Sequence, residues 1–388
     1  MLWNHYVYRR KHDVFDLWDA MFIGRRSKLL YIAGRGFDVR AQYVLDQLLN
    51  AVHGGEYEIE QATLLLVGFQ GYELSDELQS LTQENTKSLH ELFEKIGSVI
   101  DITLGGPSNG NEEMRATSAL RSGIEQVIAH LDGYTDIILD VSSLPRVMYL
   151  SLMTGILSRL VVDKSNSACL AASGVNFQIL VAENAGLDSH IRSEDPSDEL
   201  VLIPGFGGAL YAESVQDWPL VWFPMLGENR TGQFDKIAAL ANIPDYAEIC
   251  PILPHPSLNP RRADDLLMQF RHQLFDARGV STTNILLAHE SNPFEAYRQL
   301  LRAMKRYKES LSILGGCRLW VTPLSSKLMT LAAGLACFEM RPAMLDTSLY
   351  GVAIPYAEPK RYVADVSELR SSTSELSALL LTGSAYAI

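Results

Sequence analysis

Short apolar runs alternate with longer segments in which apolar residues recur at helical spacing along most of this chain. The run KLLYIA (28–33) suits a strand buried in a parallel sheet, and VRAQYVLDQLLNAV (39–52) carries its apolar residues on one helical face. Similar runs predict strands at 63–69, 99–106, 136–143, 177–184, 200–208, 220–226, 283–290, 317–323 and 350–359. Strands that alternate with helices are typical of βαβ units, so we expect an α/β fold with mostly parallel sheets.

The alternation predicts two Rossmann-like halves, 28–185 and 200–365, because an acidic, proline-containing stretch between them interrupts it. Outside the halves lie an N-terminal segment rich in aromatic residues (1–27) and a C-terminal tail (366–388). The tail is expected to be either a docking helix or a frayed end.

Two pairs of segments share a plan of strand, polar loop and helix. One pair is LLYIAGRGFDVRAQYVLDQLL (29–49) and NILLAHESNPFEAYRQLLRAM (284–304). The other is IILDVSSLPRVMYLSLMTGIL (137–157) and LWVTPLSSKLMTLAAGLACFE (319–339), with Ser-Ser in both loops. The halves therefore either arose by internal duplication or only share the general pattern of α/β folds.

Composition excludes several classes of function. A formal net charge of −13 opposes an extended nucleic-acid surface, although it leaves room for a local basic pocket that holds a small anion. The four cysteines are far apart, which predicts free thiols in a reducing cytoplasm and no metal site. The N-terminus lacks a signal peptide, and no apolar stretch reaches about 18 residues, so we expect a cytoplasmic protein without a membrane span. Nothing in the sequence indicates a cofactor.

The loop that follows the predicted strand 317–323 is a candidate ligand site. Ligands of open α/β sheets bind where strands lead into helices, because helix N-termini offer unpaired N–H groups and a partial positive charge. Thr322, Ser325 and Ser326 could hydrogen-bond a ligand here. Lys327 opposes the dipole of the following helix unless an anion lies between them. Alternatively, the serines only cap the helix and Lys327 points into water.

Two other loops have a similar position. In DVSSLPR (140–146), Ser142, Ser143 and Arg146 repeat the serine and cation pattern, and Asp140 either orients Arg146 or holds a ribose hydroxyl. The alternative is an Asp–Arg pair that closes a helix cap.

The loop AGRGFDVR (33–40) has two of the three glycines of a dinucleotide fingerprint, since Val39 takes the third position. Its candidate ligand residues are Gly34, Arg35, Gly36, Asp38 and Arg40. The sequence of this loop resembles the S-adenosylmethionine loop of carboxyl methyltransferases, which would imply methyl transfer. The acidic residue expected at the end of the next strand is absent, because TLLLVGF (63–69) ends in Gly-Phe.

His289 and Glu290 end the predicted strand 283–290 and, with Asp140, are the candidates for acid–base catalysis. A structural His–Glu pair is the alternative, and H-E-S-N is not the zinc motif H-E-x-x-H. Arg261 and Arg262 precede a predicted helix, where they either clamp an anion or pair with Asp264 and Asp265.

The segment VTPLSSKLMTLAAGLACFE resembles the CARF group of Rossmann-like sensors, which use a loop such as Ser/Thr-x-Gly-Thr-Lys before a helix. Lys327 matches the lysine, Ser326 stands in place of the threonine and Ser325 in place of the glycine. The resemblance implies binding of cyclic oligonucleotides in prokaryotic defence, by dimers that carry an effector domain.

The sequence thus predicts a protein that binds a nucleotide or another phosphorylated ligand, as a sensor or subunit of a prokaryotic defence system. An enzyme acting on a nucleotide-like or sugar-phosphate substrate is one alternative. The other is a scaffold subunit, or a homo-oligomer, that contacts its partners through the C-terminal tail or the N-terminal aromatic residues. These are Trp3, Tyr6, Tyr8, Phe15, Trp18 and Phe22.

Overall fold

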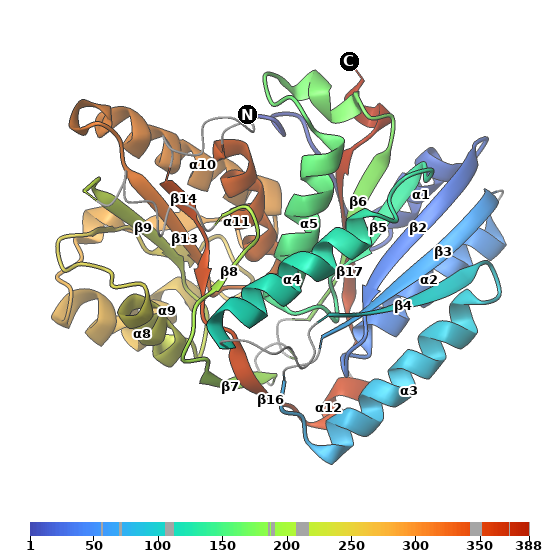
Figure 1. Ribbon diagram of the computed structural model, residues 1–388, viewed down its shortest axis with the longest axis horizontal. Helices are drawn as coiled ribbons and strands as arrows, with labels where there is room; N and C mark the ends of the chain where they lie inside the picture. Colours follow the sequence, from blue (N-terminus) through green and yellow to red (C-terminus); the bar gives the residue numbers. More distant parts are fainter. Residues whose placement is uncertain are drawn as a thin grey trace. The chain divides into compact units, whose positions relative to one another are not determined.

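The computed structural model describes residues 1–55, 57–69, 72–104, 112–184, 187, 191–206, 217–341, 351–371 and 373–387. The described chain forms two compact units. The terminal unit, named for the chain ends that it holds, is Leu2–Asp195 with Lys360–Ile388. The central unit, which is central in the sequence, is Pro196–Pro359 with Met1. Both units are mixed α/β (Figure 1).

The terminal unit is built on one mostly parallel sheet, with the strand order β1-β17-β6-β5-β2-β3-β4 among the described residues. Strands β2 to β6 are parallel, while β17 is antiparallel to both of its neighbours, β6 and β1. The strands are β1 (Val7–Arg10), β2 (Arg26–Gly34), β3 (Glu58–Phe69), β4 (Ser98–Leu104), β5 (Asp136–Asp140), β6 (Asn176–Glu183) and β17 (Glu375–Thr382).

The described helices of this unit lie between successive strands of the chain. They are α1 (Asp13–Phe22), α2 (Arg40–Gly54), α3 (Asp76–Phe93), α4 (Glu112–Ile128), α5 (Arg146–Leu160) and α12 (Val366–Ser371). Helix α2 packs against α3, and α4 packs against α5. In Figure 1, α4 and α5 lie in front of the sheet. Strands β2, β5 and β6 are buried over most of their length, as the continuous apolar runs of parallel strands predict.

Both chain ends are part of the terminal sheet, which corrects the prediction of a separate N-terminal segment and a C-terminal tail. Strand β17 lies between β1 and β6, and seven of its eight residues are buried. The indole N–H of Trp3 donates to the carbonyl of Leu381 (3.0 Å), and that of Trp18 donates to Gln178 Oε1 (3.1 Å). Trp3, Trp18 and Phe22 are buried, so these aromatic side chains stabilise their own unit and are not a docking surface.

The central unit has a parallel sheet with the order β12-β11-β9-β13-β14 in its described part, and the short β10 also pairs with β9. Its strands are β9 (Leu220–Met225), β10 (Glu248–Ile249), β11 (Ile252–Pro254), β12 (Leu286–Ala288), β13 (Arg318–Pro323) and β14 (Gly351–Ala353). Its α-helices are α8 (Thr231–Leu240), α9 (Arg262–Gln269), α10 (Pro293–Ser310) and α11 (Lys327–Met340). Helix α11 is buried on almost all sides and packs against α10.

The described parts of the predicted strands 200–208 and 350–359 are more broken than expected, while residues 207, 208 and 350 lie outside the described residues. Strand β8 (Val201–Leu202) pairs antiparallel with β15 (Pro355–Tyr356), apart from the main sheet. Strand β16 (Pro359–Val363) pairs with β7 (Arg192–Pro196). Four prolines within 196–204 and 355–359 explain these short strands, because proline cannot donate a backbone hydrogen bond.

The parallel strands of both units follow one order. Numbered along the chain within each unit, with the short β10 left out, β4-β3-β2-β5-β6 and β12-β11-β9-β13-β14 both read 3-2-1-4-5, which is the Rossmann order 3-2-1-4-5-6 without its sixth strand. The predicted pair 137–157 and 319–339 therefore occupies equivalent positions, because β5 and β13 are both the fourth strand. The predicted pair 29–49 and 284–304 is wrong, since β2 is a first strand and β12 is a third strand.

No helix in the described part of the chain is both long and apolar enough to cross a bilayer.

Candidate functional site

The order 3-2-1-4-5 reverses between the first and the fourth strand of each unit. Ligands of open α/β sheets bind at this reversal, beyond the carboxyl ends of the strands. The reversal lies between β2 and β5 in the terminal unit and between β9 and β13 in the central unit. Most of the predicted ligand residues are in the four loops that follow these strands. The contacts of the two loops in each unit therefore indicate whether a ligand could bind there.

In the terminal unit, the two loops close on each other. Ser143 Oγ donates to the carbonyl of Gly34 at 2.8 Å, and a Cβ atom added to Gly34 would lie 2.7 Å from that hydroxyl oxygen. Gly36 also lies against the backbone of Ser143. The hydroxyl of Ser142 accepts the N–H of Ala182 on β6 at 2.9 Å. Both serine hydroxyls thus hold neighbouring strand ends together.

Asp140 is fully buried at the end of β5. Its carboxylate accepts the Tyr31 hydroxyl (3.1 Å) and the N–H of Ser142 (2.9 Å). Burial, and after it the Asp140 carboxylate, raise the pKa of Tyr31 well above the ordinary value for tyrosine, so the phenol stays a donor. Asp140 is therefore placed to fix the loop after β5.

The charged residues after β2 have partners within the unit. Asp38 and Arg40 are buried, and the Arg40 Nη2 atom lies 2.6 Å from Asp38 Oδ2. The guanidinium of Arg35 instead extends over β3 and β4, where Nη2 donates to Thr103 Oγ1 at 3.0 Å and Nη1 lies 3.7 Å from Asp101. The sequence placed these cations near one ligand, but Arg40 pairs internally and Arg35 points across the sheet.

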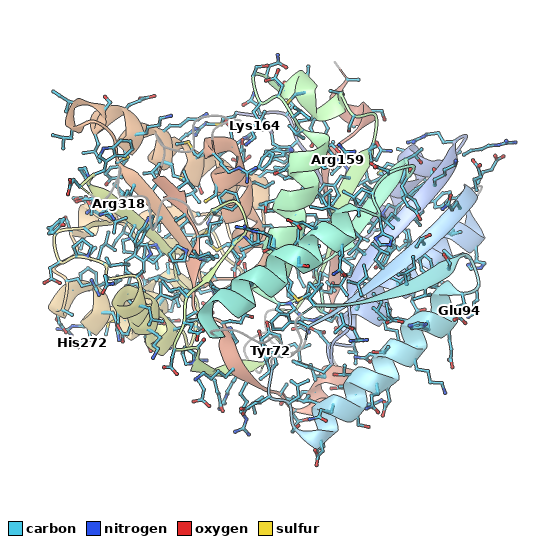
Figure 2. All side chains as sticks on the ribbon, in the orientation of Figure 1. Tyr72, Glu94, Arg159, Lys164, His272 and Arg318 are labelled. Atoms are coloured by element: carbon cyan, nitrogen blue, oxygen red, sulfur yellow. The ribbon has the colours of Figure 1, made fainter. Side chains whose placement is uncertain are left out.

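Apolar and aromatic side chains gather around the same loops. Phe37 and Val39 pack on a cluster formed by Leu78, Leu81, Leu187 and Leu369. A chain of half-buried rings joins Phe37 to Tyr362 (6.0 Å between centroids), Tyr362 to Tyr72 (5.0 Å) and Tyr72 to Phe69 (5.2 Å). Tyr72, labelled in Figure 2, comes just before Glu73, whose backbone forms an isolated parallel β-bridge with that of Arg361 in β16. Arg146 begins α5 and is half-buried.

In the central unit, the loops after β9 and β13 also touch. A Cβ atom on Gly227 would lie 2.3 Å from the carbonyl oxygen of Leu324, so no other residue fits without a shift of the backbone. Thr322 is fully buried, and its hydroxyl accepts the indole N–H of Trp222 at 2.8 Å. Thr322 therefore stabilises the core and does not face the loop, where it was predicted to hydrogen-bond a ligand.

Ser325, Ser326 and Lys327 lie at the start of α11. The hydroxyl of Ser326 accepts the N–H of Met329 (3.4 Å) and caps the helix, while the buried Ser325 hydroxyl donates to the Met329 sulfur (3.1 Å). Lys327 is the first helical residue and is half-buried. Across the reversal, the half-buried Arg230 directly precedes α8. Each of these basic residues thus lies at the positive end of a helix, where the helix dipole favours an anion.

A charged cluster that the sequence analysis missed lies beside this reversal. Arg262, the first residue of α9, faces Glu228 after β9, with Nε 2.7 Å from Oε1 and Nη2 2.7 Å from Oε2. Its Nη1 atom is paired with Glu290 after β12. The expected alternative, pairing of Arg262 with Asp264 or Asp265, is wrong. Glu228 follows Gly227 directly after a buried strand, which was the signal available in the sequence.

His289 and Glu290 lie at the end of β12, in a different unit from Asp140. The backbone N–H of His289 donates to Gln299 Oε1 (3.2 Å), and that of Glu290 donates to the Pro256 carbonyl (3.1 Å). Among the residues that the structure describes, no group of three His, Cys, Asp or Glu side chains is arranged to hold a metal ion.

Comparisons with known proteins add little. No protein-family model matches the chain, and no curated protein matches it significantly. One similar solved structure is described as a universal stress protein from Pseudomonas aeruginosa UCBPP-PA14, at 12% identity over 86% of this chain and 94% of that chain, with a TM-score of 0.22. Another is described as a UDP-N-acetylglucosamine 2-epimerase from Listeria monocytogenes, at 13% identity over 77% and 74%, also with a TM-score of 0.22. Similarity at this level indicates nothing about what the present chain binds.

Proposed function

We propose that the central unit binds a nucleotide or another small phosphorylated ligand over the carboxyl ends of β9 and β13. The observation that carries this proposal is the pair of half-buried basic residues, Arg230 and Lys327, at the starts of α8 and α11 on either side of the strand-order reversal. An anion between them would meet two cations and the positive ends of two helices.

The terminal unit is the weaker candidate for the same function. Its loop serines hydrogen-bond to Gly34 and Ala182, and Arg40 is held by Asp38. A ligand there would have to break buried contacts before it could form its own. In the central unit, the hydroxyls of Ser325 and Ser326 bond to Met329 in the first turn of α11, and these bonds can persist when an anion arrives.

The role of sensor or subunit in prokaryotic defence follows from the resemblance of the Ser-Ser-Lys loop to CARF proteins. This resemblance makes cyclic oligonucleotides the first ligands to test. A sensor of this kind would bind without turnover.

The experiment is isothermal titration calorimetry with AMP, ATP and cyclic oligoadenylates. We expect binding by the wild type and a loss of about tenfold in affinity for Lys327→Gln, because one charge-assisted contact to phosphate is removed. Arg302→Gln is the matched control, since Arg302 is exposed on α10. Equal affinities for the two variants would overturn the proposed site.

An enzyme remains the second candidate because His289 and Glu290 lie at the carboxyl end of β12, on the same edge of the same sheet. Incubation with the nucleotide panel and mass spectrometry would detect product. Turnover that is lost in His289→Ala would support acid–base catalysis by this residue. Binding without any product would favour the sensor.

A further inference from the structure

Arg262 is held by two carboxylates on different edges of its guanidinium. Glu228 faces the Nε and Nη2 atoms with both of its oxygens, at 2.7 Å each. Glu290 is paired with Nη1. Only Nη2 donates a hydrogen bond to Glu228, and the buried Nε has no hydrogen-bond partner among the described residues despite its distance from Oε1. This edge of the guanidinium is the one with which arginine can bind a carboxylate or a phosphate at two points.

The two glutamates are held very differently. The Glu290 side chain is 12% exposed, and its backbone N–H is bonded to the carbonyl of Pro256. The Glu228 side chain is 44% exposed, and it lies in the loop directly after Gly227. Arg262 itself is 16% exposed. Glu290 is therefore the fixed partner of Arg262, and Glu228 is the partner that can leave.

The position of Glu228 connects this cluster to the proposed ligand site. Gly227 touches Leu324, the residue just before Ser325 and Ser326. Neighbouring parallel strands are about 4.8 Å apart, and β11, which precedes the helix of Arg262, is next to β9. Arg262 thus lies one strand away from the reversal, on its β11 side.

We propose that Glu228 takes the place of a ligand phosphate on Arg262. A phosphorylated ligand displaces Glu228 from the Nε and Nη2 edge, while Glu290 keeps the guanidinium in position. This inference builds on the proposed function and adds a binding residue, Arg262, and an internal competitor, Glu228. Glu228 can leave readily, because its side chain is 44% exposed and water can solvate the released carboxylate.

The test is calorimetric titration of Glu228→Gln with two probes, inorganic pyrophosphate and AMP. Glutamine keeps the size of the side chain but removes the competing charge, so both probes should bind about tenfold more tightly than to the matched control Glu309→Gln. Glu309 is exposed on α10 and carries the same charge. Equal or weaker binding by Glu228→Gln would overturn the inference.

A second variant tests whether the gain in affinity depends on Arg262, and its melting curve shows whether the protein is still folded. Arg262→Lys retains a cation beside Glu290 but lacks the planar fork. In the double variant Glu228→Gln/Arg262→Lys the gain should disappear, with a thermal melting curve close to that of Glu228→Gln. A gain that persists in the double variant would also overturn the inference.

The same titrations separate this inference from the proposed function. Lys327→Gln reports on the reversal site, and Glu228→Gln reports on Arg262. Weakening by Lys327→Gln without a gain from Glu228→Gln would leave the proposed function standing and remove the inference. A gain from Glu228→Gln that Lys327→Gln does not change would support Arg262 and overturn the site at α11. Failure of every variant to bind either probe would overturn both.

Discussion

The loops after β5 and β13 hold the same position in their two units, and both carry two adjacent serines before a basic residue. In the terminal unit, Ser142 and Ser143 reach β6 and the end of β2. In the central unit, the hydroxyls of Ser325 and Ser326 bond to Met329, one turn into their own helix. The two adjacent serines thus join three strand ends in the terminal unit, whereas in the central unit they bond within the first turn of a helix.

The charged residues around the two loops also differ, because their ion pairs are more buried in the terminal unit than in the central unit. The terminal unit uses Asp38 to hold Arg40 in a buried pair of neighbouring residues. The central unit pairs Arg262 with carboxylates from two other loops, and one of these is nearly half exposed. We conclude that a basic residue at a helix start is not by itself evidence of a ligand site. The exposure of its carboxylate partner indicates whether a ligand can compete for the basic residue.

The largest expected effect is in the terminal unit. Asp38→Ala leaves the buried Arg40 without its nearest carboxylate, so we expect the free energy of unfolding to fall by about 3–5 kcal/mol. Asp132→Ala is the control, because the Asp132 side chain is 76% exposed and its pair with Arg159 is on the surface. Urea unfolding followed by circular dichroism measures both, and a similar loss for the two variants would show that the Asp38–Arg40 pair is not structural.

The close approach of the central loops should give the next largest effect. In Gly227→Ala, the new methyl group would collide with the Leu324 carbonyl, and overpacking of this kind lowers stability by about 1–3 kcal/mol. Gly232→Ala in α8 has open space around its Cβ atom and should be neutral or slightly stabilising. If thermal unfolding shows no difference between these variants, the contact of the two loops is looser than described.

The equivalent cations Arg146 and Lys327 sharpen the comparison of function. We expect Lys327→Gln to weaken AMP binding about tenfold and Arg146→Gln to leave it unchanged, because the serines beside Arg146 are committed to strand contacts. Calorimetry on the two variants at one ionic strength is the measurement. An equal loss in both would indicate that the terminal unit also binds the ligand.

The smallest effect concerns a buried thiol of the central unit. Burial raises the pKa of Cys250 from near 9 to about 11. In the unfolded chain this thiol ionises near pH 9, while in the folded chain it stays protonated until about pH 11, so its contribution to stability is complete below pH 9 and is lost between these values. The stability difference between the wild type and Cys250→Ala should therefore shrink from pH 8.5 to 10.5 in urea titrations, and a constant difference would contradict the shift.

The sequence was sufficient for the alternation of strands and helices. Apolar runs such as KLLYIA gave β2, and the strand and helix on either side of Ser325 and Ser326 are where the pattern put them. Strand β17 was not predictable, because ELSALLLT fits a short helix as well as a strand and its partner β6 is far away in the sequence.

The roles of the loop residues were harder to predict than their positions. Thr322 looked like a ligand contact, but Trp222 on the neighbouring strand takes its hydroxyl. The cluster of Glu228, Arg262 and Glu290 joins three loops, and these meet only because the strand order is 3-2-1. Neither fact can be read from local periodicity, which says nothing about the order of strands in a sheet.

The placement of β17 also bears on how the protein is made. During synthesis, β1 leaves the ribosome well before β17, its partner in the sheet. The whole central unit is translated in between, so it can fold first, against the usual N-terminal-first order of domains. Until β17 has been synthesised, β1 and β6 each lack the neighbour that pairs with one of their edges in the finished sheet, and such unpaired edges can pair with other chains.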